Sequence, residues 1–136
     1  MELLSPAGSY EALLAAVQNG ADAVYMGLGS FNARRSARNF TDEDFARAVD
    51  YCHERGVKVY LTLNTLLTDR ELPGAAELLH KASRLGADAV LIQDWGVWQL
   101  ARQAAPELPL HASTQMSLMN LDGVKRAADL GCTRAV

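Results

Sequence analysis

The sequence predicts an α/β fold, a (β/α)8-type parallel barrel of which this chain forms part, and three patterns indicate it. Short apolar strands alternate with amphipathic helices along the whole chain, an order typical of parallel strands joined by right-handed crossovers. The motif Gly-Ala-Asp-Ala-Val at residues 20–24 recurs at residues 86–90. In both copies a glycine ends a helix and a buried strand follows. Polar residues gather on one face of the later strands, which predicts a lumen on that side.

The first half of the chain supplies two strand–helix units and a third strand. We expect a strand over residues 2–4, a turn over residues 5–8, a helix over residues 10–19 with Ser9 as N-cap, and a strand over residues 23–26. A polar loop follows over residues 28–40. Thr41 and Asp44 then resemble a capping box that opens a helix running to residue 55. Gly56 ends it, and residues 58–63 form the third strand.

The second half continues the alternation. We expect a helix from about residue 69 to 85, with Pro73 tolerated in its first turn, and a strand over residues 89–92. A helix from Trp95 leads to Pro106 and then to a strand over residues 110–115. Asn120 or Asp122 caps the next helix, Gly131 ends it, and a sixth strand begins at residue 134.

The strand over residues 110–115 favours a barrel over a doubly wound sheet. Its expected alternation places Leu110, Ala112 and Thr114 on one face and His111, Ser113 and Gln115 on the other. A doubly wound sheet buries both faces of its central strands under helices, which gives continuous apolar runs. A polar inner face is instead typical of a barrel, whose site lies at the carboxyl ends of the strands. Tyr60, Thr62 and Asn64 repeat this polar pattern on the third strand.

The chain is one domain, residues 1–136, and supplies about five and a half βα units. A complete barrel of this type has eight strands and typically about 250 residues, so the remainder is expected to be absent from this chain. The open first and last strands would then invite self-association. A monomer at every concentration in light scattering would contradict that expectation.

Composition excludes several classes of protein. Hydrophobic residues make up 49% of the sequence and the formal net charge is −3, which supports a core and gives no general attraction to nucleic acid. No apolar run is long enough for a membrane span, and the start lacks the features of a signal peptide. Cys52 and Cys132 are best interpreted as buried thiols, which fits a cytoplasmic location.

Five ordered segments carry a resemblance to a known family: residues 2–8, 19–25, 31–34, 59–65 and 111–116. Together they resemble the N-terminal part of peptidase family U32, the collagenase-like peptidases. The resemblance implies a TIM-type barrel and a peptidase of unknown catalytic type acting on collagen-like substrates. It also implies an alternative, since other members are implicated in hydroxylating bases of transfer or ribosomal RNA, or the ubiquinone ring. Some members hold an iron–sulfur cluster through four cysteines in a later region, and neither Cys52 nor Cys132 matches that motif. We therefore expect no cofactor and no metal in this chain.

The candidate site lies where the strands end. We expect His111 and Asn64 to be catalytic, His111 because an imidazole ordinarily titrates near neutrality. The expected substrate-binding residues are Tyr25, Arg34, Gln93, Ser113 and Gln115. The alternatives are a hydrogen-bonded structural network for the strand residues and a solvated loop for Arg34 and its neighbours Arg35 and Arg38.

Other chemistry is poorly supported by the sequence. Ser113, His111 and Asp94 could form a hydrolytic triad, but no nucleophile-elbow motif is present, and no His-Glu-x-x-His motif indicates a metalloprotease. Trp95 and Trp98 are expected to pack helices, and Glu2 to have a structural role at the base of the barrel.

Three functions stay open at this point. The first is a U32 peptidase, of which this is the N-terminal barrel portion. The second is hydroxylation of an RNA base or the ubiquinone ring by an iron–sulfur member of the family. The third is a structural module without activity of its own. The expected partner is a peptide or RNA substrate bound by the whole protein, and no membrane.

Overall fold

Strands and helices alternate throughout the computed structural model, which describes residues 1–29, 31 and 40–136. The strands are β1 (Leu4–Pro6), β2 (Ala23–Met26), β3 (Lys58–Leu63), β4 (Ala89–Ile92), β5 (Leu110–Ala112) and β6 (Cys132–Ala135). The helices are α1 (Tyr10–Gln18), α2 (Asp42–His53), α3 (Leu72–Arg84), α4 (Trp95–Ala104), α5 (Leu121–Asp129) and a short 3₁₀ turn, η1 (Thr114–Met116). None of the described helices is long and apolar enough to cross a bilayer.

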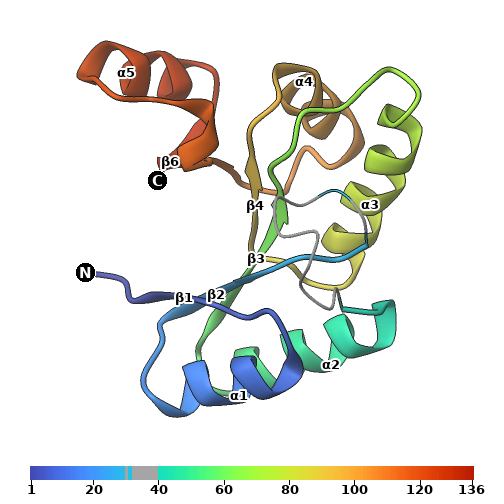
Figure 1. Ribbon diagram of the computed structural model, residues 1–136, viewed down its shortest axis with the longest axis vertical. Helices are drawn as coiled ribbons and strands as arrows, with labels where there is room; N and C mark the ends of the chain where they lie inside the picture. Colours follow the sequence, from blue (N-terminus) through green and yellow to red (C-terminus); the bar gives the residue numbers. More distant parts are fainter. Residues whose placement is uncertain (30, 32–39) are drawn as a thin grey trace.

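The six strands form one parallel sheet in the order β1-β2-β3-β4-β5-β6. Each strand pairs with the next one along the chain, so the winding never reverses as it does in a doubly wound sheet. Figure 1 shows helices α1 to α4 following the outer side of the strands. The predicted fold class, a partial (β/α)8 barrel, is confirmed.

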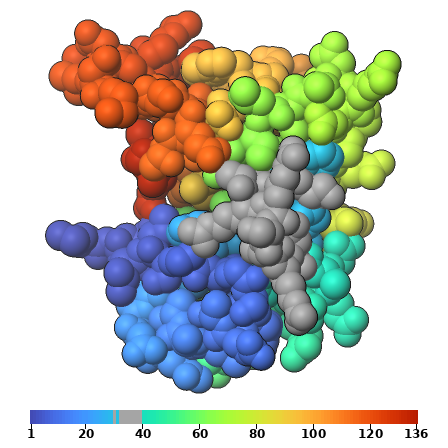
Figure 2. Space-filling model, in the orientation of Figure 1, coloured from blue at the N-terminus to red at the C-terminus, as the bar shows by residue number. Residues whose placement is uncertain are grey.

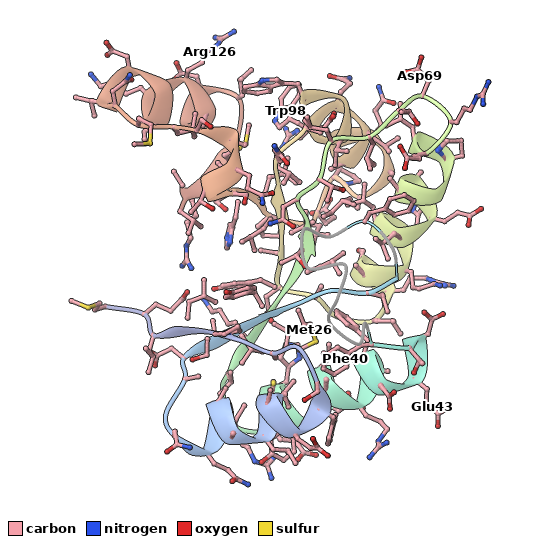
Figure 3. All side chains as sticks on the ribbon, in the orientation of Figure 1. Met26, Phe40, Glu43, Asp69, Trp98 and Arg126 are labelled. Atoms are coloured by element: carbon pink, nitrogen blue, oxygen red, sulfur yellow. The ribbon has the colours of Figure 1, made fainter. Side chains whose placement is uncertain are left out.

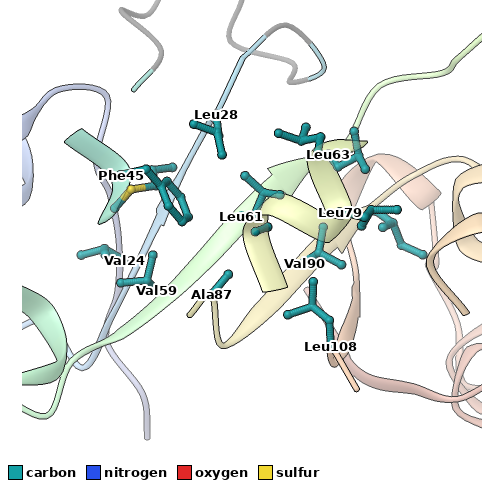
Figure 4. Packing of buried hydrophobic residues seen from close by; sticks show 14 of the residues in the cluster. Val24, Leu28, Phe45, Val59, Leu61, Leu63, Leu79, Ala87, Val90 and Leu108 are labelled. Atoms are coloured by element: carbon teal, nitrogen blue, oxygen red, sulfur yellow. The ribbon is translucent and has the colours of Figure 1, made fainter. Parts of the chain in front are cut away.

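The two faces of the sheet carry different side chains. The outer face and the helices share one large apolar cluster, in which Phe45 of α2 and Leu79 of α3 pack with Val59 and Leu61 of β3 (Figure 4). The inner face has a separate, smaller cluster made only of strand residues: Ala23, Tyr60, Ala89 and Leu91, with Leu4 and Tyr25 against it. We call the space on this inner side the lumen. The outer face is therefore apolar under the helices, whereas the inner face combines apolar residues with the tyrosines Tyr25 and Tyr60.

The recurring Gly-Ala-Asp-Ala-Val motif has a structural explanation. Gly20 and Gly86 adopt φ angles of 86° and 88° at the ends of their helices, a left-handed conformation that glycine adopts without the steric cost of a Cβ. The aspartate two residues later accepts a hydrogen bond from a backbone N–H at or just before the start of the preceding strand. Asp22 Oδ2 accepts from Leu3 N at 2.7 Å, and Asp88 Oδ2 from Val59 N at 2.7 Å. Each copy thus joins the start of one strand to its neighbour.

The structure corrects the first strand. It covers Leu4–Pro6 rather than residues 2–4, so Ser5 and Pro6 are strand rather than turn. Pro6 lacks a backbone N–H, and a proline is tolerated on an edge strand. Among the described strands β1 pairs only with β2. Glu2 lies before the strand, where its side chain is free to turn into the lumen.

Two further boundaries differ. Helix α3 begins at Leu72 rather than near residue 69, because Thr68 donates hydrogen bonds from both its N–H and its hydroxyl to the Glu71 carboxylate and so closes a turn first. Strand β6 begins at Cys132, two residues earlier than expected. The ends of α1 and α2 agree with prediction to within two residues.

The first and last described strands do not pair with one another. Figure 2 shows an indentation between the N-terminal segment, in blue, and the C-terminal segment, in orange and red, on this side of the molecule. Self-association through these strand edges stays a prediction.

Candidate functional site

The carboxyl ends of β3 and β5 meet through Asn64 and Ser113. The Asn64 side-chain amide Nδ2 donates to Ser113 Oγ at 3.4 Å, and Ser113 is buried. Strand β4 lies between these two strands, and in a flat sheet second neighbours are roughly 10 Å apart. A side-chain contact across β4 is easier in a sheet that is concave toward the lumen. Asn64 and Ser113 occupy the place that the sequence predicted for the site.

His111 lies lower in the lumen, on the inner face of β5. It is 6% exposed, and its ring meets that of Tyr60 in an edge-to-face arrangement with centroids 4.7 Å apart and planes at 76°. Its Nδ1 atom is buried and has no hydrogen-bond partner. Burial lowers the pKa of His111 to about 4, and the positive charge of Arg134 acts in the same direction. With a pKa of about 4 the imidazole is neutral at pH 7, unlike an ordinary histidine, and the catalytic role of His111 stays a prediction.

Glu2, Tyr60 and Arg134 form a polar network beneath His111. Arg134 donates from Nη2 to Glu2 Oε2 at 3.1 Å and from Nη1 to Oε1, so the pair is bidentate. The Tyr60 hydroxyl donates to the same carboxylate, at 3.0 Å to Oε2 and 3.2 Å to Oε1. The hydrogen bond from Arg134 holds the pKa of Glu2 below its usual value. The expected structural role of Glu2 agrees with this arrangement.

Gln115 differs from prediction. Strand β5 ends at Ala112, and residues 114–116 form the 3₁₀ turn η1. Ser113 ends the strand because its hydroxyl accepts a hydrogen bond from the backbone N–H of Gln115, which bends the chain into the turn. Gln115 and Thr114 are both exposed rather than placed on opposite strand faces. The prediction of a six-residue strand is wrong at these two residues and at Ser113.

The remaining candidates lie in three different settings. Tyr25 is half-buried on β2 in the inner cluster, and Gln93 is half-buried directly after β4. The Asp94 carboxylate accepts two backbone hydrogen bonds. One comes from Val97 N at 3.0 Å and caps α4, and the other comes from Leu67 N, in the segment after β3, at 3.2 Å. Arg34 and the neighbouring arginines lie outside the described residues.

No hydrolytic triad is assembled in the described part of the chain. The hydroxyl of Ser113 accepts from Asn64 and from its own turn, and the Asp94 carboxylate accepts from two backbone N–H groups. The ring of His111 lies against Tyr60, and its buried Nδ1 atom has no hydrogen-bond partner. The site offers hydrogen-bonding groups but no activated serine.

The cysteines do not fit a cluster-binding role. Cys52 is buried on α2, and its burial raises the pKa of the thiol to about 11; Cys132 is buried on β6, and its pKa is also raised. A metal ligand is a thiolate, which burial in apolar surroundings disfavours. Within residues 1–29, 31 and 40–136, no three His, Cys, Asp or Glu residues are grouped to hold a metal ion.

The two tryptophans of α4 differ in burial. Trp98, labelled in Figure 3, is half-buried and donates from Nε1 to the carbonyl of Leu130 at 3.1 Å, which joins α4 to the end of α5. Its packing role agrees with prediction. Trp95 is 51% exposed at the start of α4.

The sequence placed Tyr60 on the polar inner face but predicted neither its hydrogen bond to Glu2 nor the presence of Arg134 in the lumen. Tyr60 carried a signal, because it alternates with apolar residues on β3. Arg134 carried little, since an arginine near the end of a strand is ordinarily a surface residue.

A concave arc of parallel strands, with helices outside and polar side chains at the carboxyl ends, defines a (β/α)8-barrel protein. The chain belongs to peptidase family U32, whose sequence model matches residues 8–136. The chain is 41% identical over 137 residues to "tRNA hydroxylation protein P" of Helicobacter pylori, covering all of this chain and 32% of that protein. It is 40% identical over 136 residues to "23S rRNA 5-hydroxycytidine C2501 synthase" of Escherichia coli, covering all of this chain and 20% of that protein.

A third relative has a different name. The "Collagenase" of Porphyromonas gingivalis is 36% identical over 125 residues, which is 91% of this chain and 30% of that protein. Among solved structures, the U32 peptidase Mk0906 matches with a TM-score of 0.75 at 15% identity, over 97% of this chain and 56% of that chain; at this identity the likeness shows the fold alone. The chain thus spans a third or less of the length of these curated relatives.

Proposed function

We propose that this chain forms the barrel portion of a protein that hydroxylates a base of transfer or ribosomal RNA. The observation that carries the proposal is the 41% and 40% identity, over the whole chain, to relatives named for tRNA hydroxylation and for 5-hydroxycytidine synthesis in rRNA. The chemistry of the site supports it, because the described residues offer amide, hydroxyl and imidazole groups without an activated nucleophile. Such groups suit the hydrogen-bonding edge of a base.

Each residue would bind and orient the base. The Asn64 amide can both donate and accept, which matches the mixed donor and acceptor edge of a nucleobase. Ser113 fixes Asn64 through their hydrogen bond, and His111 offers a neutral imidazole. Replacing a C–H bond by C–OH adds one oxygen atom to the base and oxidises it by two electrons, so the reaction also needs an oxygen source and an oxidant, which the described residues do not provide. An iron–sulfur cluster in a later region of the whole protein stays a prediction.

A second candidate is hydrolysis of peptide bonds. The likeness to the Porphyromonas gingivalis collagenase favours it, and the same amide and hydroxyl groups could bind a peptide backbone. The two functions separate in one experiment on the whole protein. Mass spectrometry of nucleosides from RNA incubated with the protein reports hydroxylation, and release of peptides from gelatin reports hydrolysis. Hydroxylated nucleosides without peptide release are expected, and peptide release alone would contradict the proposal.

Replacing Asn64 with alanine tests the site. Asn64→Ala removes a half-buried amide at the mouth of the barrel, so we expect activity to fall at least tenfold while the melting temperature stays within about 2 °C. A loss of one hydrogen bond to a bound group ordinarily costs about this much. Gln103→Ala is the matched control, because it removes an exposed amide from the outer helix α4. Full activity in Asn64→Ala would remove the mouth of the barrel from the proposed site.

A further inference from the structure

Tyr60 contacts both the Glu2–Arg134 pair and the ring of His111. We propose that Tyr60 is a positioning residue, held by Glu2 and Arg134, whose ring fixes the orientation of the His111 imidazole for substrate. The inference rests on the proposed function, because it requires that His111 contact the substrate.

Tyr60 is itself fixed from two sides. It is 1% exposed, its hydroxyl donates to both oxygens of the Glu2 carboxylate, and the guanidinium of Arg134 lies over its ring at 5.3 Å from the centroid. Arg134 and Glu2 are bound to one another, with side-chain exposures of 33% and 23%. A ring held at its hydroxyl and over its face has little freedom to turn. The network thus fixes the orientation of the Tyr60 ring on the inner side of the sheet.

The orientation of the His111 imidazole depends on its contact with the Tyr60 ring. The orientation of a functional imidazole is usually set by a hydrogen bond to the ring nitrogen that does not face the substrate. In His111 no such bond exists, because Nδ1 is buried without a partner. The ring does make an edge-to-face contact with Tyr60, at 4.7 Å between centroids. A contact of this geometry is favourable and directional.

Charged groups from three elements face His111. Arg134 of β6 and Lys58 of β3 disfavour the imidazolium, and Glu2, before β1, favours it. Burial acts with the two cations, so the neutral form prevails. The ring of Tyr60 contacts the buried imidazole and covers part of it. Removing the Tyr60 ring would admit water and make the charged form less costly.

The test compares three variants of the whole protein by NMR titration of the His111 ring and by steady-state kinetics. In Tyr60→Leu the ring is lost, so we expect the pKa of His111 to rise by at least one unit and kcat to fall at least tenfold, with KM changed less than threefold. In Tyr60→Phe the ring stays, so we expect most of kcat and the native titration to be kept. Tyr51→Leu, on the outer helix α2, is the matched control and should change neither.

Arg134→Gln keeps the test decisive if Tyr60→Leu does not fold. Removing the cation and leaving Glu2 unpaired both favour the imidazolium, so the pKa of His111 is expected to rise. Native kcat and an unchanged His111 titration in Tyr60→Leu, or an unchanged titration in Arg134→Gln, would overturn the inference. If Asn64→Ala loses activity but Tyr60→Leu keeps its native kcat, the inference fails and the proposed function stands. If the unchanged protein forms no hydroxylated nucleosides, the proposed function fails, and the His111 titration in Tyr60→Leu still tests the contact between the two rings.

Discussion

Lowering the pH from 7 to 4 is expected to reduce the free energy of unfolding by about 3 kcal/mol through His111 alone. The pKa of His111 is about 4 in the folded protein, against an ordinary value of 6.5. Between these two values the unfolded chain binds the proton and the folded chain does not, so stability falls as the pH falls. The free energy of unfolding begins to fall when the pH drops below about 6.5, and the loss due to His111 is nearly complete at pH 4.

Urea unfolding at pH 7, 5.5 and 4 measures this effect when the protein is compared with His111→Gln. The comparison is needed because Glu2, whose pKa is lowered, also loses stabilisation in acid. His80→Gln, at an exposed position on α3, serves as the control and should retain the full pH dependence. If His111→Gln lost stability toward pH 4 as steeply as the unchanged protein, His111 would not be buried as a neutral imidazole.

Truncating Leu61 is expected to lower the free energy of unfolding by about 2–5 kcal/mol. Leu61 is fully buried on the outer face of β3, where it packs under the helices beside Val59 and Leu79 (Figure 4). Leu61→Ala removes buried methyl groups from the middle of the large apolar cluster, and the strands on both sides limit collapse of the cavity.

Leu66→Ala is the matched control, since Leu66 lies just after the same strand and is 71% exposed. Chemical unfolding should show a change within about 0.5 kcal/mol for this variant. Equal effects of the two substitutions would mean that β3 does not present Leu61 to the helices.

The central strands were predictable because local signals agree there. The bounds of β2, β3 and β4 match the prediction, because each strand is a short, mostly apolar segment that begins two or three residues after a left-handed glycine. The capping roles of Ser9, Thr41 and Asn120 were also predictable, because a cap depends only on residues three positions apart. These features depend on local sequence, which a single chain displays.

The lumen was predictable only in outline. The polar face of β3 and β5 could be read from alternation, but the end of β5 could not, because one side-chain hydrogen bond from Ser113 overrides the strand pattern. The lowered pKa of His111 comes from burial and from the charge of Arg134, which lies on another strand. The pairing of Glu2 with Arg134 joins residues 132 positions apart. No local pattern predicts such contacts.

That pair gives the most direct test of the central claim, which is that successive parallel strands curve around one lumen. Glu2 lies before β1 and Arg134 on β6, and their side chains meet only if the sheet is strongly curved. A double-mutant cycle with Glu2→Gln, Arg134→Gln and the combined variant, followed by urea unfolding, measures their coupling. A coupling of about 1 kcal/mol is predicted for a bidentate, partly buried pair. A coupling of zero within error would contradict the curved sheet and the site built inside it.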